Sequence, residues 1–398
     1  MIILDKYFSQ SVKKIADNFL VKLKKGKLNV IYPDGDQRSF IGEKSGYEAD
    51  INLSNYKLFS KLLRKGSIGF AESYMDGDFN TSNLLNLLLF SFGNESDFLE
   101  NRKNHSFIEY YIKFKHALNQ NTKNKSKKNI KHHYDLGNDF YGYWLDKTMT
   151  YSSAIFSEKN YDLHDAQIHK YDQIAKPMKL NENSNLLEIG CGWGGFSTYI
   201  AKKYKSKIKA ITISKAQFEF ASQRILKEGL NEKVSVEMKD YRDINQKYSN
   251  IASIEMFEAV GKEYWGIFLD TLKKSLHPKG LASLQIITIS DDRAFKYQNR
   301  PDFIQQYIFP GGILPSKRQL KDLSLDMGLS FKEHQNFKNS YAETLKLWNQ
   351  KFQKAWPDIS LQQGFSLRFK KMWEYYLTYC EVGFITGATD VSHFLIKK

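Results

Sequence analysis

The chain has 398 residues, with 41% hydrophobic and 26% charged side chains, which is typical of a globular protein of two or three domains. Its 59 Lys and Arg outweigh 44 Asp and Glu, giving a formal net charge of +15. Two distant cysteines exclude a disulfide framework. We find neither a secretory signal nor an apolar run approaching ~18 residues, so we expect a cytoplasmic protein that meets a membrane only at its surface.

Residues 1–121 are predicted to form an α+β domain that could contact a lipid surface. Apolar side chains recur at helical spacing between Phe8 and Leu23, which predicts an amphipathic helix. Residues 27–31 and 39–41 are short extended runs on either side of a Pro-Asp-Gly-Asp turn, a pattern that predicts a β-hairpin.

The next segment is strongly basic: residues 102–131 hold nine Lys or Arg and one acid, Glu109. Such a run is most often a solvated linker, and it also suits an anionic membrane surface. We therefore place a linker at residues 122–131 and a second domain at residues 132–398. The sequence has neither zinc-finger spacing nor an RNP-like aromatic motif beside this basic run. We therefore expect no nucleic-acid partner.

Strands and helices alternate in the second domain. The segments that read as strands are residues 185–189, 207–213, 233–238, 251–256 and 280–289. This alternation predicts an α/β fold with a doubly wound, mostly parallel sheet, whose ligands bind at the carboxyl ends of the strands. The helix after the second strand should have Ser214 as its N-cap and an apolar face of Ala216, Phe220, Ile225 and Leu226.

A glycine-rich turn follows the first of these strands, with glycines at Gly190, Gly192 and Gly194. Glycine tolerates positive φ and lets a ligand approach the backbone. A nicotinamide enzyme would have an acid at the end of the second strand, where this chain has Ser214, and here an acid, Glu188, precedes the glycines instead. That arrangement is typical of S-adenosylmethionine-dependent methyltransferases.

Between about residues 132 and 384 the chain resembles the cyclopropane fatty acid synthases and their relatives that methylate unsaturated acyl chains. The matching segments are HYDLGNDF (133–140), YS (151–152), LEIGCGWGG (187–195), DYRD (240–243), MFE (256–258), YIFPGG (307–312) and LPS (314–316). A weaker match at residues 69–79 extends to the N-terminal domain of longer members. The resemblance implies a class I methyltransferase fold with lid insertions.

The implied reaction is methyl transfer from S-adenosylmethionine to the double bond of an unsaturated phospholipid acyl chain, at the inner surface of the membrane. The product would be a cyclopropane or a methyl-branched chain. Residues 291–345 would form an acyl-pocket insertion, in which we favour residues 307–316 as a lid over a buried loop. The resemblance also leaves room for a homodimer.

Carried over by position, the resemblance implies a cofactor site. Tyr151 and Ser152 would hold the methionine end, above Gly190, Gly192 and Gly194, with Glu188 just before them. The ribose and adenine would be lined by Thr212, Gln217, Asp240, Tyr241 and Ile254. For each of these residues, packing or capping is the alternative role.

Methyl transfer leaves a positive charge on the acyl chain, which aromatic faces or a carboxylate can stabilise, and a base must then remove a proton. The resemblance implies a bound bicarbonate as that base, lined by Glu258 and Tyr341. Ser153, Ala259 and Gln285 replace a Cys and two His of the family. Ser and Gln can hydrogen-bond an oxyanion but supply no imidazolium, so these changes put ring closure in doubt.

Cys380 matches a cysteine that the family associates with activity, although packing is the interpretation that its surroundings favour. The histidine spacing predicts no metal site. Two other functions stay open. A methyltransferase for a small amine or a phospholipid headgroup would need the same cofactor fold, and a lipid-binding protein that has lost catalysis would explain the three substitutions, but not the intact glycine turn.

Overall fold

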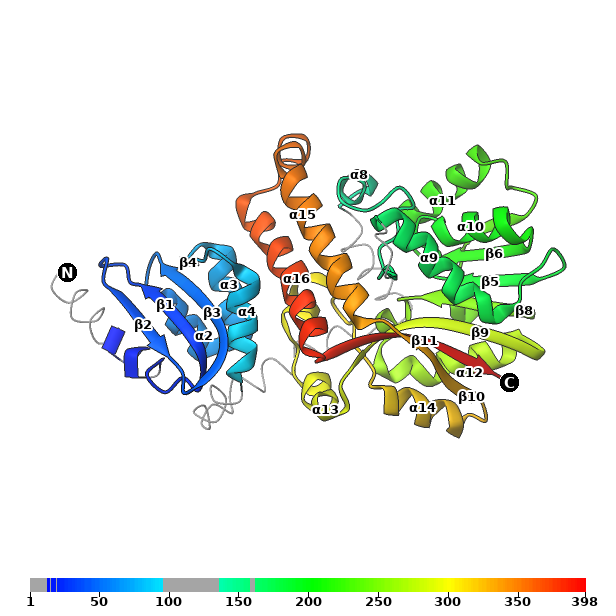
Figure 1. Cartoon of the computed structure of the whole chain (residues 1–398). Helices are drawn as coiled ribbons and strands as arrows, with labels where there is room; N and C mark the ends of the chain where they lie inside the picture. Colours follow the sequence, from blue (N-terminus) through cyan, green and yellow to red (C-terminus); the bar gives the residue numbers. More distant parts are fainter. Residues whose placement is uncertain (1–12, 15, 19, 96–135, 158–161) are drawn as a thin grey trace. The chain divides into compact units, whose positions relative to one another are not determined.

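The computed structural model describes residues 13–14, 16–18, 20–95, 136–157 and 162–398. The chain divides into two compact units, residues 1–114 with 356–382 and residues 115–355 with 383–398, and the division runs through two long helices (Figure 1). Residues 356–382 therefore group with the N-terminal part, whereas the sequence assigned them to the second domain. The predicted linker at 122–131, the basic run around it, and most of the predicted helix between Phe8 and Leu23 lie outside the described residues.

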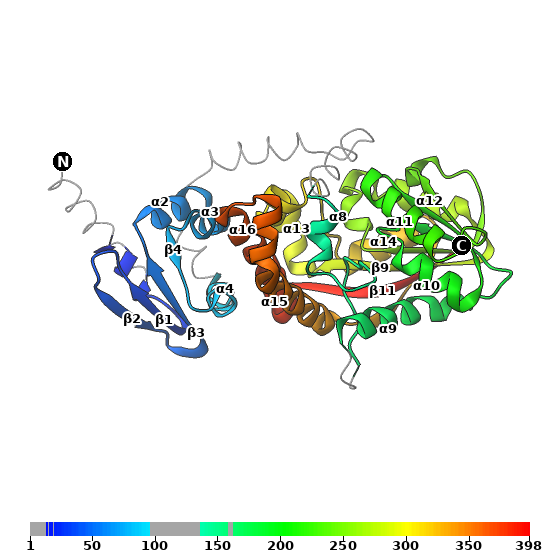
Figure 2. The ribbon, with the colours of Figure 1, turned by 90° about the horizontal axis from the view of Figure 1, so that it is seen from above.

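The first unit contains a sheet of order β2-β1-β3-β4. Its strands are β1 (Lys25–Ile31), β2 (Gln37–Ile41), β3 (Lys44–Leu53) and β4 (Phe79–Asn80). The predicted hairpin is confirmed, since β1 and β2 pair antiparallel. Strand β3 was not predicted; it pairs parallel to β1, and helix α4 (Leu84–Gly93) packs on it (Figure 2).

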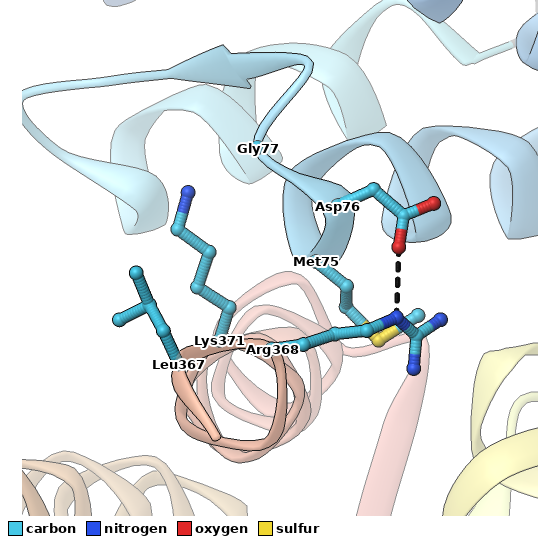
Figure 3. Close-up of a pocket in the computed structure, with 6 residues that line it drawn as sticks. All are labelled: Met75, Asp76, Gly77, Leu367, Arg368 and Lys371. Atoms are coloured by element: carbon cyan, nitrogen blue, oxygen red, sulfur yellow. Dashed lines mark hydrogen bonds and ion pairs between the residues drawn. The ribbon is translucent and has the colours of Figure 1, made fainter.

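The first unit also contains helices α2 (Lys57–Lys65) and α3 (Ser67–Asp76). Residues of α16 (Leu367–Thr386) belong to it as well. Arg368 Nε lies 2.7 Å from Asp76 Oδ1, beside a pocket lined by Met75, Gly77, Leu367 and Lys371 (Figure 3). Lys371 Nζ also donates to Asn80, at 2.9 Å. Arg368 and Asp76 are largely exposed, so this ion pair contributes at most about 1 kcal/mol.

Among the described residues of the second unit, seven strands form one sheet of order β10-β11-β9-β8-β5-β6-β7. The predicted strands correspond to β5 (Asn185–Ile189), β6 (Lys207–Thr212), β7 (Val234–Met238), β8 (Tyr248–Ile254) and β9 (Leu276–Ile289), which pair parallel. The mostly parallel sheet is thus confirmed. Two unpredicted strands, β11 (Thr389–Lys397) and β10 (Ser330–Asn336), extend it antiparallel beyond β9.

Helices cover both faces of this sheet (Figure 1). Leu186 points to a core cluster with α9, α10 and α11, and the adjacent Leu187 points to a cluster with α12 and α14, because successive strand residues face opposite sides. The bounds of the α-helices are α8 (Asn138–Gly142), α9 (Leu163–Ala175), α10 (Gly195–Tyr204), α11 (Lys215–Lys227), α12 (Trp265–Ser275), α13 (Asp291–Asn299), α14 (Lys317–Asp326) and α15 (Lys338–Gln363). Short 3-10 helices are η1 (Lys176–Met178), η2 (Tyr241–Asp243), η3 (Phe257–Ala259) and η4 (Lys262–Tyr264), and η5 (Ile304–Ile308) is a π-helix.

Ser214 caps α11 as predicted, since its side chain accepts from the Gln217 amide. The predicted apolar face is wrong in part: Leu226 is 68% exposed, and the buried residues are Gln217, Ala221 and Ile225. The helix therefore turns a polar residue, Gln217, inward next to the end of β6.

The predicted insertion at 291–345 holds α13, η5, α14, β10 and the beginning of α15, so it includes the edge strand of the sheet. Residues 307–316 are held by two backbone contacts: Ile313 donates its amide to the Glu258 carbonyl in η3 at 2.8 Å, and Ser316 bridges to Ile289 at the end of β9. In the described part of the chain, no helix is both long enough and apolar enough to cross a membrane.

Candidate active site

The glycine turn joins β5 to α10. Gly190, Gly192 and Gly194 have φ values of 82°, 52° and 79°, in the left-handed region that favours glycine. A Cβ on Gly190 would lie 2.8 Å from Met256 Cγ, whereas a Cβ on Gly192 would meet no heavy atom within 4 Å. Space is therefore open above Gly192, at the carboxyl edge of the sheet where ligands of this fold bind.

Glu188 precedes this turn, on β5, and is buried. Its carboxyl accepts a hydrogen bond from Ser197, in the first turn of α10. Burial raises the pKa of Glu188 to about 7, although the Ser197 hydroxyl and the charge of Lys170 oppose the shift. In this arrangement Glu188 ties the strand to the helix and thereby fixes the turn between them.

Polar side chains gather where β6 and β7 end. Thr212 Oγ1 donates to Gln217 Oε1 at 2.9 Å, and both residues are buried. Asp240 accepts from Arg242 through both carboxylate oxygens, at 2.9 and 2.7 Å. These interactions hold Thr212, Gln217 and Asp240, three of the side chains expected to line the ribose and adenine, at one edge of the sheet.

The other two residues expected to line the ribose and adenine are Tyr241 and Ile254. The ring of Tyr241 belongs to the core and lies 5.3 Å from that of Phe268, centroid to centroid. Its buried hydroxyl has no hydrogen-bond partner among the described residues. Ile254 is partly buried at the end of β8.

Tyr151 lies in an aromatic cluster built from separate parts of the unit. Its ring centroid is 5.4 Å from those of Tyr141, Trp144 and Trp348, and 6.4 Å from that of Phe309. Such a cluster of π-faces can both exclude water and stabilise a cation.

Ser152, the residue after Tyr151, is held by α9. The Ser152 carbonyl accepts from Gln167 Nε2 and its hydroxyl from Lys170 Nζ, each at 2.8 Å. Lys170 is fully buried, and burial lowers its pKa to about 8, while the charges of Glu255, Asp146 and Glu188 raise it. Lys170 is therefore mostly protonated at neutral pH and supplies a buried positive charge.

Helix α15 fixes the same segment from another direction. Ala154 donates its amide to Thr344 Oγ1 and Phe156 donates its amide to Ser340 Oγ, each at 3.1 Å. Hydrogen bonds from α9 and α15 therefore position the segment that contains Tyr151 and Ser152.

The carboxylate of Glu255 lies at the centre of a cluster of hydrogen-bonding groups. Its Oε1 accepts from the Ser153 amide at 2.9 Å and from Gln285 Nε2 at 2.7 Å, and its Oε2 accepts from the Tyr341 hydroxyl at 2.6 Å. Burial raises the pKa of Glu255 above its ordinary value, and these three donors together with the charge of Lys170 offset only part of that shift. The residue has a φ of 49°, which is uncommon for a side chain other than glycine and marks a position held by its surroundings.

Gln285 is oriented by the neighbouring strand. Its position on β9 pairs with Ile254 on β8 and with His393 on β11. His393 Nε2 lies 3.1 Å from Gln285 Oε1, and burial lowers the pKa of His393 well below its ordinary value. A neutral imidazole that donates from Nε2 thus turns the Gln285 NH₂ group towards Glu255.

Glu258, three residues after Glu255, has different surroundings. Its Oε1 accepts from the Ile287 amide at 2.5 Å, while its buried Oε2 has no hydrogen-bond partner among the described residues. Burial, and then the charge of Glu255, raise the pKa of Glu258 to about 8. Glu258 is therefore mainly a neutral carboxylic acid at pH 7.

The structure brings Ser153, Gln285 and Tyr341 together, but around Glu255. The Ser153 hydroxyl itself donates to the neighbouring Ala154 carbonyl. Cys380 lies in α16, in the first compact unit, and is partly exposed. Within the described ranges, His, Cys, Asp and Glu form no group of three or more that could hold a metal ion.

Sequence reasoning missed Glu255, Lys170 and His393. Glu255 could have been found as a second acid three residues before Glu258, at the carboxyl end of a predicted strand. Lys170 and His393 gave no such signal, because their positions depend on how α9 and β11 pack.

Comparison with known proteins gives consistent results. The family model of mycolic acid cyclopropane synthetase matches residues 121–394. The chain is 35% identical over 349 residues to the cyclopropane-fatty-acyl-phospholipid synthase of Escherichia coli, covering 87% of each chain. It is 34% identical over 342 residues to the tuberculostearic acid methyltransferase UfaA1 of Mycobacterium tuberculosis, covering 84% of this chain and 79% of the relative.

Solved structures show the same likeness. The mycolic acid cyclopropane synthase CmaA1, in complex with SAH and CTAB, has a TM-score of 0.64 and 29% sequence identity, over 68% of this chain and 98% of that one. Coclaurine N-methyltransferase, at 18% identity and a TM-score of 0.65, shares the fold over 83% of this chain and 99% of that one.

Proposed function

Because the chain belongs to the mycolic acid cyclopropane synthetase family, we propose that it transfers a methyl group from S-adenosylmethionine to the double bond of an unsaturated phospholipid acyl chain. It is an S-adenosylmethionine-dependent methyltransferase by family. The observation that best supports the acyl acceptor is the aromatic cluster around Tyr151 next to a carboxylate site, because an alkene acceptor becomes cationic during the reaction.

The cofactor supplies an electrophilic methyl group on a sulfonium. The open space above Gly192 fits such a ligand, and we assign its methionine end to Tyr151, Ser152 and the glycine turn. Thr212, Gln217 and Asp240 would meet the ribose, and Tyr241 and Ile254 the adenine. Glu188 contributes by holding the turn through Ser197.

An isolated alkene is a poor nucleophile, so the site must place it against the methyl group and exclude water. Tyr151, Trp348 and Phe309 would do both. We propose that Glu258, neutral and buried, lies beside the reacting carbons together with Tyr341. Cys380 would then act only through packing, or not at all.

The resemblance implied a bicarbonate lined by Glu258 and Tyr341, with Ser153 and Gln285 as departures beside it, but these four residues do not fit a second anion. Tyr341, Gln285 and the Ser153 amide already donate to Glu255, and the neutral carboxyl group of Glu258 could offer a bound anion only one O–H donor. We therefore assign no step to bicarbonate in this chain.

A headgroup methyltransferase is the second candidate, because Glu255 and the aromatic cluster could also hold a cationic amine. The two are separated by incubating the full chain with S-adenosylmethionine and vesicles of dioleoyl or distearoyl phosphatidylethanolamine, whose headgroup carries an amine, and measuring S-adenosylhomocysteine release. Turnover only with the unsaturated lipid is expected. Equal turnover with both lipids would contradict the acyl proposal.

We also propose that the protein works in the cytoplasm at the inner membrane surface, supported by its net charge of +15. The homodimer expected from the resemblance stays a prediction, which light scattering of the purified protein would check.

A further inference from the structure

We infer that the Glu255 carboxylate takes the place of a bound bicarbonate and is the base that removes the proton after methyl transfer. The inference rests on the proposed acyl methyl transfer. It starts from the Glu255 side chain, which receives hydrogen bonds from three groups that point towards a single carboxylate: the Ser153 amide, the Gln285 NH₂ and the Tyr341 hydroxyl.

The hydrogen bonds indicate the charge state of Glu255. All three partners are donors, and a donor set favours the ionised form of a carboxylate over the protonated form. Lys170 adds a buried positive charge nearby, whereas His393 is neutral and acts only by turning Gln285. The three donors and Lys170 therefore favour the ionised form of Glu255 against the burial that raises its pKa, and they hold the carboxylate in a fixed orientation without any added ion.

A carboxylate has about four lone-pair sites, and the three donors use two on Oε1 and one on Oε2. One site on Oε2 stays available to accept a proton. Neighbouring Glu258 cannot compete as the base at neutral pH, because it is already mainly protonated. The pair thus separates into one anionic and one neutral carboxyl group, an arrangement that assigns acid and base roles.

The chemical step balances with these groups alone. Methyl transfer forms a carbon–carbon bond, releases S-adenosylhomocysteine and leaves one positive charge on the acyl chain. Glu255 then takes a proton, and the electron pair of the broken C–H bond neutralises that charge. If the proton comes from the new methyl group, a cyclopropane ring closes; if it comes from an adjacent chain carbon, a methylated alkene forms.

The backbone at Glu255 makes a sharp test available. With a φ of 49°, position 255 accepts glycine without strain, so E255G should fold and should leave the donors of Ser153, Gln285 and Tyr341 around an empty space. That space should accept a small carboxylate from solution. E255Q keeps the side-chain size but cannot act as a base.

The assay uses the full chain with methyl-labelled S-adenosylmethionine and dioleoyl phosphatidylglycerol vesicles in carbon-dioxide-free buffer, with and without added bicarbonate or formate. Wild-type turnover should not depend on bicarbonate. E255Q should lose about 10²- to 10⁴-fold in rate, the usual effect of a general base. E255G should be slow alone and regain activity with bicarbonate or formate, while S-adenosylmethionine binding by calorimetry stays normal in both variants.

A matched control is E228Q, because Glu228 pairs with Lys202 on the exposed surface at the end of α11. It should behave as wild type and show no response to formate. Wild-type turnover that needs added bicarbonate, or an E255Q variant with normal turnover, would overturn the inference and leave acyl methyl transfer intact. No label in any lipid with wild type would overturn acyl methyl transfer itself, and the inference with it.

Discussion

Glu255 and Glu258 differ in their hydrogen bonds more than in their burial. Glu255 receives three donors, whereas Glu258 receives one backbone amide and faces the charge of Glu255. The sequence shows both acids at the end of a strand, but it cannot show which one the donors surround. That depends on Tyr341 from α15 and Gln285 from β9, which meet only in the folded chain.

The raised pKa of Glu258 predicts a pH-dependent stability. The folded state keeps the proton up to about pH 8, whereas the unfolded chain releases it near its ordinary value of about 4.3. Between these values the folded state binds more protons, so the contribution of Glu258 to the free energy of unfolding is fully present below the lower value and is lost as pH rises.

Thermal unfolding of wild type and E258Q from about pH 5 to about pH 9 measures this contribution, because Gln does not titrate there. The melting temperature of wild type should fall relative to that of E258Q as pH rises. A difference that stays constant with pH would show that Glu258 is ionised throughout.

Tyr341 should affect the pKa of Glu255, the proposed base. Its hydroxyl hydrogen bond lowers the pKa of Glu255, so Y341F should raise that pKa and move the acidic limb of the kcat/KM profile to higher pH. Losing a charge-assisted hydrogen bond of about 1.5–3 kcal/mol predicts a fall in rate of about ten- to a hundredfold. Y199F is the control, since Tyr199 also donates to a carboxylate, Asp172, at the surface of α10. An unshifted profile in Y341F would contradict the role.

At the scale of elements, strong local patterns predicted the structure well. Strands β5 to β9 appear close to their predicted bounds, because each contains several apolar residues, at least one of them β-branched, and alternates with a helix. Strand β10 was missed because its side chains are mostly exposed and polar, as suits the edge of a sheet. Strand β11 was missed because its partner β9 is far away in sequence.

Substitutions at two glycines of the turn should distinguish a position that meets the cofactor from a position that is needed for packing. G192A adds a methyl group in open space, so we expect the melting temperature to fall only slightly, from the positive φ, and S-adenosylmethionine affinity to fall at least about tenfold. In G195A the new Cβ would lie 2.8 Å from the Thr148 carbonyl oxygen, so the fold itself should be destabilised. Calorimetry and thermal unfolding measure both effects. Normal affinity in G192A would exclude the cofactor from that space.

At the scale of the whole molecule, the sequence predicted two domains but not that residues 356–382 group with the N-terminal part. Local patterns cannot reveal this, because the division interrupts two continuous helices, α15 and α16. Contacts such as Arg368 with Asp76 depend on residues nearly three hundred positions apart.

The net charge of +15 predicts salt-dependent membrane binding of the full chain. In vesicle flotation, binding should increase with the fraction of phosphatidylglycerol and decrease as salt is raised, because added salt shortens the range of charge attraction to about 3 Å at 1 M. Equal binding to neutral phosphatidylcholine vesicles would contradict an electrostatic surface contact.

Acyl methyl transfer is tested most directly by locating the methyl carbon. The full chain is incubated with ¹³C-methyl S-adenosylmethionine and unsaturated phospholipid vesicles, and the released acyl chains and headgroups are examined separately by NMR. We predict label only in the acyl chains, at the former double bond, as a cyclopropane or as a methylated alkene. Label in the headgroup fraction, or in neither fraction, would contradict the account.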